Sequence, residues 1–493
     1  MIKIHQGAQP VRRPISKKSI VAVIAASLSM GTASAADLIG SATKNLNAGT
    51  ITAGTGFTSH DLCTRVMVSG DSVLNVKLNY LVPKVWPLPL IWDVNFYAGD
   101  RVTTKTILPL LDFPRTAIYR AGLGCTVVPP GTSISSVRAQ GFRPLTPSPL
   151  TFAPWPKGEY PAESQLMSAV MAKTVTQQGD SLFAETTVDT FKQQNTVAYL
   201  VAKDGHLLFE RYAPGYNRSQ PQIGWSMSKS LTSLIAGVMA TDGRISLDAP
   251  VGIPQWTTDS QKAGITWRNL LTNSPGLHWF EGYEGASDAT EMLYSKADQG
   301  NWAANRPMEN APGTVFNYST GFVNIAILRM KQILGNNHQA IYDYYQQKLF
   351  APLGIRHGII EPDASGTPVG GARGILRPVD WLRLGQLVAQ HGRWNGQQII
   401  SAAYMDFALA PSAADPIYGA YIWRLTANDP EIPADVRSKL PADTVWFQGH
   451  LGQYVVIVPS QNLVVLRMGV TFDKMESKRR VMTAVADILA ANT

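Results

Sequence analysis

Cysteine is scarce in this sequence, which has only Cys63 and Cys125 among 493 residues. No cluster of cysteine and histidine at metal-ligand spacing is present, so neither a structural metal nor another cofactor is expected. Two cysteines in an oxidising compartment most simply form one disulfide, and two buried free thiols are the alternative. The chain is therefore not expected to be a metalloprotein.

Charge is also sparse, at 16% of residues, whereas the 45% hydrophobic content is that of an ordinary globular protein. The formal net charge is +8, but residues 1–35 carry five lysines and arginines and no acid, and without them it falls to +3. Beyond residue 35 the one basic run is Lys478-Arg479-Arg480, which follows Glu476. A nucleic-acid partner is not expected, and a small molecule is the better candidate.

The first 35 residues have the pattern of an export signal. A basic stretch (1–18) precedes an apolar run (19–30) and the small residues Ala33-Ser34-Ala35, which predict a cleavage site. The apolar run is short for a membrane span, although an uncleaved anchor is the alternative. We expect a periplasmic or secreted protein with no stable membrane insertion after cleavage.

Two regions follow the leader before the main domain. Residues 36–127 are predicted to be a small β-rich extension with strands in three β-branched or aromatic runs: Arg65–Ser69, Val73–Leu81 and Ile91–Tyr97. Residues 128–164 are dense in proline and predict an extended linker, with Trp155 as an anchoring side chain.

Residues 165–493 predict one α+β domain. Its strands are expected to form two hairpins: Thr196–Ala202 with His206–Tyr212, and Tyr454–Pro459 with Leu463–Met468. Helices are expected between the hairpins and over residues 473–491. Strands at both ends with helices between them indicate one antiparallel sheet assembled from both ends of the domain.

The stretch 224–243, GWSMSKSLTSLIAGVMATDG, predicts a helix that is buried on one face. Its apolar residues recur at helical spacing: Leu231, Leu234, Ile235, Val238 and Met239. Asp242-Gly243 would end the helix, because glycine readily adopts the left-handed conformation of a helix stop.

Ser226 and Lys229, three residues apart, would lie on the same face of this helix, within hydrogen-bond reach. A desolvated lysine whose pKa falls toward roughly 7–8 can take the proton of a serine nucleophile. The Ser-x-x-Lys pattern is weak by itself, because it recurs at Ser41–Lys44 and an exposed polar face explains it equally well. Trp225 is expected to pack rather than to react.

Five stretches together resemble the β-lactamase-like serine hydrolases, and within them the class C β-lactamase-related esterases and 6-aminohexanoate-dimer hydrolases. They are GWSMSKS (224–230), ITWRNLLTNSPGL (265–277), APGTVFNYSTG (311–321), RPVDWLRLGQL (377–387) and GHLGQYVVIVPSQNLVVLRMG (449–469). The resemblance implies a β-lactamase/transpeptidase-like fold, with an antiparallel sheet flanked by helices and a helical subdomain.

The resemblance also implies roles for single residues. Ser226 would be the acylated nucleophile, Lys229 its base and Tyr318 the tyrosine of the Tyr-x-Asn motif, which shares the proton relay. A phenol beside a lysine ammonium is a plausible proton shuttle.

The His450-Leu451-Gly452 sequence matches the Lys-Thr-Gly motif, which many esterases of this group write as His-x-Gly. His450 and Gly452 would then line the substrate site. The N–H of Gln453 would be the second oxyanion donor, opposite the N–H of Ser226.

Two departures argue against strong β-lactamase activity. Thr320 stands where asparagine is usual, and His450 stands where a lysine binds the carboxylate of a penicillin. In the stretch EGYEGASDATEML, Tyr283, Glu284 and Asp288 are candidate substrate contacts, with a solvated loop as the alternative.

The sequence therefore predicts a serine hydrolase that cleaves an ester or small amide. A non-catalytic envelope protein of the same fold that binds a ligand or a β-lactam is the alternative, and a weak β-lactamase is a third reading.

Overall fold

The computed structural model describes residues 47–491 apart from 108–111, 148, 150, 186, 188, 190 and 191. The predicted signal (1–35) and the second Ser-x-x-Lys pattern (41–44) lie outside these residues. No helix in the described ranges is long and apolar enough to cross a membrane.

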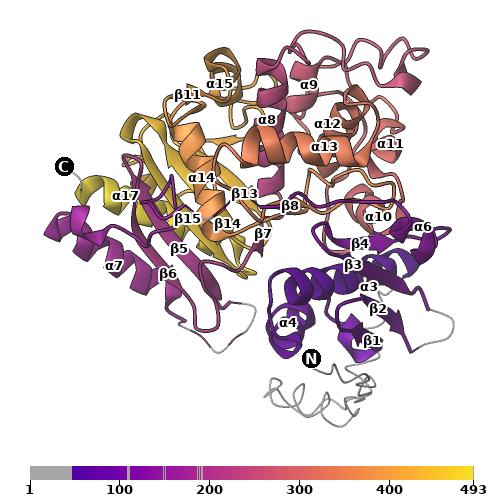
Figure 1. Cartoon of the computed structure of the whole chain (residues 1–493), viewed down its shortest axis with the longest axis horizontal. Coiled ribbons are helices and arrows are strands. Elements are labelled where there is room, and N and C mark those ends of the chain that lie inside the picture. Colours follow the sequence, from indigo (N-terminus) through magenta and orange to yellow (C-terminus); the bar gives the residue numbers. More distant parts are fainter. Residues whose placement is uncertain are drawn as a thin grey trace, which may run out of the picture. The chain divides into compact units, whose positions relative to one another are not determined.

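A six-stranded antiparallel sheet carries the main domain, with the strand order β12-β13-β14-β15-β5-β6 (Figure 1). Its strands are β5 (Thr196–Lys203), β6 (His206–Tyr212), β12 (Trp423–Arg424), β13 (Val445–Gly449), β14 (Gln453–Val458) and β15 (Leu463–Gly469). The last strand, β15, pairs with β5, so that Val465 lies opposite Val201. This confirms the predicted sheet and both predicted hairpins.

The two faces of this sheet bury different cores, as the alternation of side chains along a strand requires. Tyr199 and Val201 face α7 (Ala169–Phe183) and α17 (Lys474–Ala491), whereas Leu200 and Ala202 face the core that holds α8 and α14 (Pro378–Ala389). Nearly every residue of β5 is buried. The sheet is therefore the middle layer of the domain.

The helical part of the domain stands on the α8 side. Its helices are α8 (Met227–Thr241), α9 (Trp267–Leu271), α10 (Asp288–Ser295), α11 (Gln299–Ala304), α12 (Thr320–Ile333), α13 (His338–Tyr345) and α15 (Ala402–Leu409). The short helix α16 (Ala434–Arg437) lies on the opposite face of the sheet, with α7 and α17. A three-stranded sheet leads into α8 and contains β7 (Gln222–Ile223), β8 (Ile359–Ile360) and β9 (Gly374–Leu376), and β10 (Arg393–Trp394) pairs with β11 (Gln397–Gln398).

The N-terminal extension combines a helical segment with a four-stranded antiparallel sheet in the order β1-β2-β3-β4. Its regular elements are α3 (Ala48–Cys63), α4 (Val73–Val76), α5 (Val82–Lys84), β1 (Trp92–Tyr97), β2 (Arg101–Thr106), β3 (Arg115–Arg120) and β4 (Gly124–Val128).

The strands predicted over Arg65–Ser69 and Val73–Leu81 are wrong, because both runs are helical. Ser72 caps α4 by accepting a hydrogen bond from Asn75 N–H at 3.1 Å, which favours a helix start over an extended chain. The helical segment packs against the sheet of the extension, so tertiary contacts override the β propensity of its valines. The third run was correctly predicted and forms β1.

A disulfide joins Cys63, the last residue of α3, to Cys125 in β4, as predicted. Glu361 of the main domain is fully buried beside it. The Glu361 carboxylate accepts hydrogen bonds from Thr64 Oγ1 at 2.8 Å and Cys125 N–H at 2.6 Å, and lies 2.6 Å from His60 Nε2. The extension is thus fixed to the main domain by a buried polar cluster.

The proline-rich segment (128–164) is not extended throughout as predicted, because it contains the short helix α6 (Ile134–Arg138). After α6 the segment packs first on α13, where Phe142 meets Tyr342, and then on α14. Trp155 is 1% exposed and its indole N–H donates to the Val379 carbonyl at 3.4 Å, so the anchoring role predicted for it is confirmed. Glu159 pairs with Arg377 at 2.9 Å.

Candidate active site

Ser226 lies at the sharp turn from β7 into α8. Trp225 has a left-handed backbone (φ +50°), which is costly for a large side chain. Gly224 leaves no room for a side chain, since a Cβ there would lie 2.2 Å from Trp381. The turn leaves Ser226 partly exposed at the N-cap of α8, where its N–H belongs to the donors without a helical acceptor.

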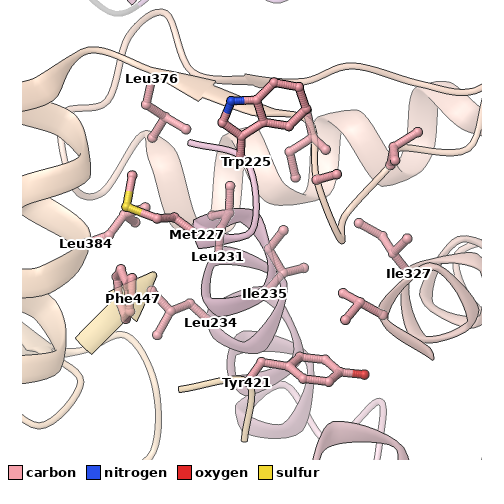
Figure 2. Packing of buried hydrophobic residues seen from close by; sticks show 14 of the residues in the cluster. Trp225, Met227, Leu231, Leu234, Ile235, Ile327, Leu376, Leu384, Tyr421 and Phe447 are labelled. Carbon is pink, nitrogen blue, oxygen red and sulfur yellow. The ribbon is translucent and has the colours of Figure 1, made fainter. Parts of the chain in front are cut away.

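The α8 helix is held from all sides, as Figure 2 shows. Met227, Leu231, Leu234 and Ile235 are each fully buried, and the neighbouring side chains come from β9, α12, α14 and β13. The helix is buried from Met227 to Met239 and reaches the surface at its two ends, at Ser226 and at Ala240–Thr241. The predicted apolar stripe therefore positions the nucleophile rigidly.

Lys229 is buried one turn into α8, with 1% of its surface exposed. Its amine donates to three oxygens: Ser226 Oγ at 3.1 Å, Thr320 Oγ1 at 2.8 Å and the Gly371 carbonyl at 2.9 Å. Burial lowers the pKa of Lys229 to about 8, although the nearby Glu281 charge opposes the shift. A measurable fraction of this amine is thus uncharged near neutral pH.

Tyr318 lies beside the Lys229 amine, in the loop before α12. The Lys229 Nζ atom is 4.7 Å from the centre of its ring. Burial raises the pKa of the Tyr318 phenol above its usual value, and a hydrogen bond with the Ser226 side chain acts in the opposite direction. Ser226, Lys229 and Tyr318 therefore form one cluster, as the resemblance implied.

Glu281 is a member of this cluster that the sequence did not indicate. Its carboxylate is 3.8 Å from Lys229 Nζ, and its side chain is 10% exposed. It accepts hydrogen bonds from the Trp279 indole at 2.5 Å and from the Thr320 backbone N–H at 2.9 Å. A lone glutamate in a polar loop carries no periodicity, so only the fold could reveal it.

Thr320 and Tyr283 connect Glu281 to the base. Thr320 Oγ1 and the Tyr283 phenol each donate to Glu281 Oε1 at 2.5 Å. The Tyr283 oxygen is 3.0 Å from Thr320 Oγ1, and burial raises the pKa of this phenol well above its usual value. Tyr283, a predicted substrate contact, thus lies within the network around Lys229.

Asp288 and Glu284 lie outside this network. Asp288 accepts from the Phe280 N–H at 2.9 Å and is 3.3 Å from His278 Nε2. The Glu284 side chain is 89% exposed and pairs with Lys84 of the extension at 3.3 Å.

His450 follows β13 at the edge of the site. Its ring is 5.9 Å from that of Trp225 and 5.6 Å from that of Tyr283. Burial, with the charges of Lys84 and Lys474, lowers the pKa of His450 well below its usual value. Its Nε2 atom is buried and finds no hydrogen-bond partner among the described residues.

Gly452 and Gln453 form the turn from β13 into β14. Gly452 needs its glycine because φ is +84° and a Cβ would lie 2.5 Å from Arg467 Nη1. Gln453 is buried, pairs with Gly449 across the hairpin and donates from its side chain to the Gly469 carbonyl at 2.5 Å. In the structure these two residues shape the hairpin.

The register of β13 directs the N–H of Gln448, rather than that of Gln453, toward the unpaired edge of this strand. Leu425 N–H donates to the Thr444 carbonyl, so the Thr444 peptide faces β12 and, by alternation, so does that of Gln448. The partners in β12 end at Trp423, opposite Trp446, which places the Gln448 N–H beyond them. Next to it a Cβ at Gly449 would be 2.1 Å from the Gly224 carbonyl, so this edge lies beside the nucleophile turn.

No group of three or more histidine, cysteine or acidic side chains that could hold a metal ion occurs in the described ranges. The cluster itself offers a buried amine, a phenol, a serine hydroxyl and a carboxylate, together with backbone donors.

Solved structures share this fold at low sequence identity. A β-lactamase homologue from Bacteroides dorei DSM 17855 aligns with a TM-score of 0.50 at 17% identity, over 66% of this chain and 99% of that one. A 6-aminohexanoate-dimer hydrolase homologue from Bacillus anthracis aligns at 0.48 and 19% identity, over 60% and 79%. EstCE1, a hydrolase with promiscuous acyltransferase activity, aligns at 0.49 and 18% identity, over 65% and 98%.

A comparison with curated proteins finds no match. The Beta-lactamase family model matches residues 184–490, which include β5, the Ser226 turn, Glu281, Tyr318 and the β13–β15 strands. Because this match covers more than half of the chain, and the fold agrees with it, the chain belongs to the Beta-lactamase family.

Proposed function

We propose that the protein is a serine hydrolase that cleaves an ester or small amide through an acyl-enzyme on Ser226. The observation that carries the proposal is the 3.1 Å contact between Ser226 Oγ and the buried Lys229 amine, whose pKa is lowered to about 8. A serine beside a desolvated amine is the pairing that nucleophilic catalysis needs.

In the proposed acylation step the uncharged Lys229 amine takes the proton of Ser226 as Oγ attacks the substrate carbonyl. The Tyr318 phenol then gives its proton to the leaving group and recovers one from Lys229. The raised pKa of Tyr318 supports this direction of transfer, because the phenol stays protonated until a strong base forms beside it. Water repeats the sequence to release the acyl group.

The negative oxygen of the tetrahedral intermediate needs backbone donors. Ser226 N–H at the start of α8 supplies the first. The resemblance assigns the second to Gln453. We place it at Gln448, because the β13 register directs that N–H to the free edge beside the Gly224 turn.

The environment of His450 supports esters or small amides as substrates over penicillins. A histidine whose pKa is lowered well below its usual value is uncharged at neutral pH and gives a substrate carboxylate no ionic partner.

We also propose that the protein acts outside the cytoplasm, in the periplasm or after secretion. The pattern of residues 1–35 and the Cys63–Cys125 disulfide support this location.

The proposal is tested with short p-nitrophenyl esters, aminohexanoate dimer, nitrocefin and a D-Ala-D-Ala peptide, each assayed with wild type and with Ser226→Ala. We expect wild type to hydrolyse an ester or the amide dimer, Ser226→Ala to lose that activity, and a mass increase on Ser226 with an activated ester. Folded wild-type protein that neither turns over nor becomes labelled would identify a binding protein instead. Nitrocefin as the best substrate would identify a β-lactamase.

A further inference from the structure

The carboxylate of Glu281 is held in one position by the protein. It lies in the loop between α9 and α10, and four donors from three residues bind it: Trp279, Tyr283 and both the backbone and side chain of Thr320. A carboxylate with a 10% exposed side chain and this many donors is fixed in place, 3.8 Å from Lys229 Nζ.

The hydrogen bonds around Lys229 determine where its lone pair points. An uncharged amine has two N–H donors, and the Thr320 hydroxyl at 2.8 Å and Gly371 carbonyl at 2.9 Å accept both. The lone pair is then left for Ser226 Oγ. Thr320 can accept from the amine because its single hydroxyl hydrogen is donated to Glu281.

We propose that Glu281 is the positioning residue of the Lys229 base: it orients the amine through Thr320, and its charge stabilises the ammonium that forms when Lys229 takes the serine proton. This role corresponds to that of the buried carboxylate behind a histidine base in serine proteases. It also explains why a threonine can stand at position 320, where the Tyr-x-Asn motif of the resemblance has asparagine.

Two effects of the carboxylate follow, and they have opposite signs. Its charge raises the pKa of Lys229 against the effect of burial, so it reduces the free base available at neutral pH. The same charge favours the ammonium once the proton has moved. The phenols facing this cluster belong to Tyr318, Tyr283 and Tyr418, and burial raises the pKa of each, so they are uncharged at neutral pH.

The inference rests on the proposed function and is tested first by the pH dependence of kcat/KM for a p-nitrophenyl ester. In Glu281→Gln the acidic limb should move at least one pH unit below that of wild type, because the amine loses its anionic neighbour. The plateau should fall roughly 100-fold, the scale of a lost acid–base partner. A merely structural role would lower the plateau and leave the limb in place.

Control variants test whether the effect belongs to the Glu281 charge or follows from any change in this part of the chain. Glu291→Gln removes a carboxylate ten residues along the same chain segment, paired with Lys296, and should leave limb and plateau unchanged. Thr320→Ser should keep the wild-type profile, whereas Thr320→Val should lose most of the activity because the hydroxyl bridge is gone. Equal losses in both Thr320 variants would overturn the bridging role.

A second measurement does not need turnover. The Lys229 pKa can be followed by the Cε signal of carbon-13 lysine, assigned with Lys229→Met, in wild type and in Glu281→Gln. A lower pKa in the glutamine variant supports the inference even if no substrate is found, and an unchanged or higher pKa overturns it. Absence of Ser226-dependent hydrolysis would overturn the proposed function alone.

Discussion

At the scale of single residues, the site depends on one buried lysine whose charge is costly. The Lys229 amine has all three of its hydrogens bound when protonated, and yet burial lowers its pKa to about 8. The protein thus accepts a destabilising group in its interior in order to keep a base beside Ser226. This cost has a measurable dependence on pH.

Lys229→Met should abolish activity and stabilise the fold at neutral pH. The folded pKa is about 8 and the unfolded value 10.5, so below pH 8 wild type bears the full cost, about 3 kcal/mol on the scale of 1.36 kcal/mol per pKa unit. Between pH 8 and 10.5 the folded state releases its proton first, and wild type gains stability as the pH rises.

Urea unfolding of both proteins at pH 7 and pH 10 measures this difference. The gap between them should shrink at pH 10. A constant gap would mean that Lys229 is not titrating with a lowered pKa.

Tyr318→Phe should reduce kcat by about 10²–10⁴-fold, the usual contribution of one general acid–base group. The ring and its packing on Trp423, 5.2 Å away, are kept, so thermal stability should change little. The loss should be larger for an amide than for a p-nitrophenyl ester, because an amine leaving group needs a proton. Equal rates for both proteins on the amide would contradict the relay.

At the scale of elements, the sequence predicted the parts of the fold that have a clear period. The strands β5 and β15 were predicted from their β-branched and apolar runs, and both are buried along nearly their whole length. The apolar stripe of α8 is buried as predicted, but the opposite, polar face of the helix is buried too. The runs at 65–69 and 73–81 could not be predicted, because valine and leucine fit a strand or a helix and tertiary packing decides between them. Periodicity alone gave no answer there.

The presence or absence of a sequence pattern also explains which site residues could be predicted from the sequence. Ser226 and Lys229 are set by helical spacing, and Tyr318 by a motif. Glu281 reaches Lys229 only because the loop after α9 folds back over α12, and nothing in its neighbourhood along the chain signals that contact.

The contact between β13 and the start of α8 should tolerate no side chain. In Gly449→Ala the new Cβ would lie 2.1 Å from the Gly224 carbonyl, so the strand edge and the nucleophile turn must separate. We expect a stability loss of roughly 1–3 kcal/mol and a larger proportional loss of kcat/KM, because the oxyanion donors move apart.

Gly264→Ala is the matched control, since a Cβ there meets no atom within 4 Å. Thermal unfolding and ester hydrolysis measured on both variants provide the comparison. Unchanged catalysis in Gly449→Ala would exclude the β13 edge from the site.

At the scale of the whole molecule, the extension and the catalytic domain share one buried polar cluster around Glu361. The disulfide ties α3 to β4 on one side of that carboxylate, and His60 and Thr64 approach it from α3. These contacts fix where α3 lies against the catalytic domain.

Removing the disulfide should therefore weaken the whole protein. Cys63→Ser with Cys125→Ser opens a link of 62 residues, and loop entropy alone predicts a loss of roughly 4 kcal/mol. Thermal melts with and without a reducing agent measure this: wild type should lose stability on reduction and the double variant should not respond. A wild-type melting temperature that is unchanged by complete reduction would contradict the expectation.

The stacking of Phe57 on Trp225 has a practical consequence. The two rings are 5.7 Å apart and parallel, and Trp225 directly precedes the nucleophile. An engineer who trims the gene to the family-matched portion, residues 184–490, would leave that indole uncovered and its costly backbone turn unsupported. Any shortened form of this protein should therefore begin at residue 47, which also keeps Trp155 and the helix α7 that packs on the sheet.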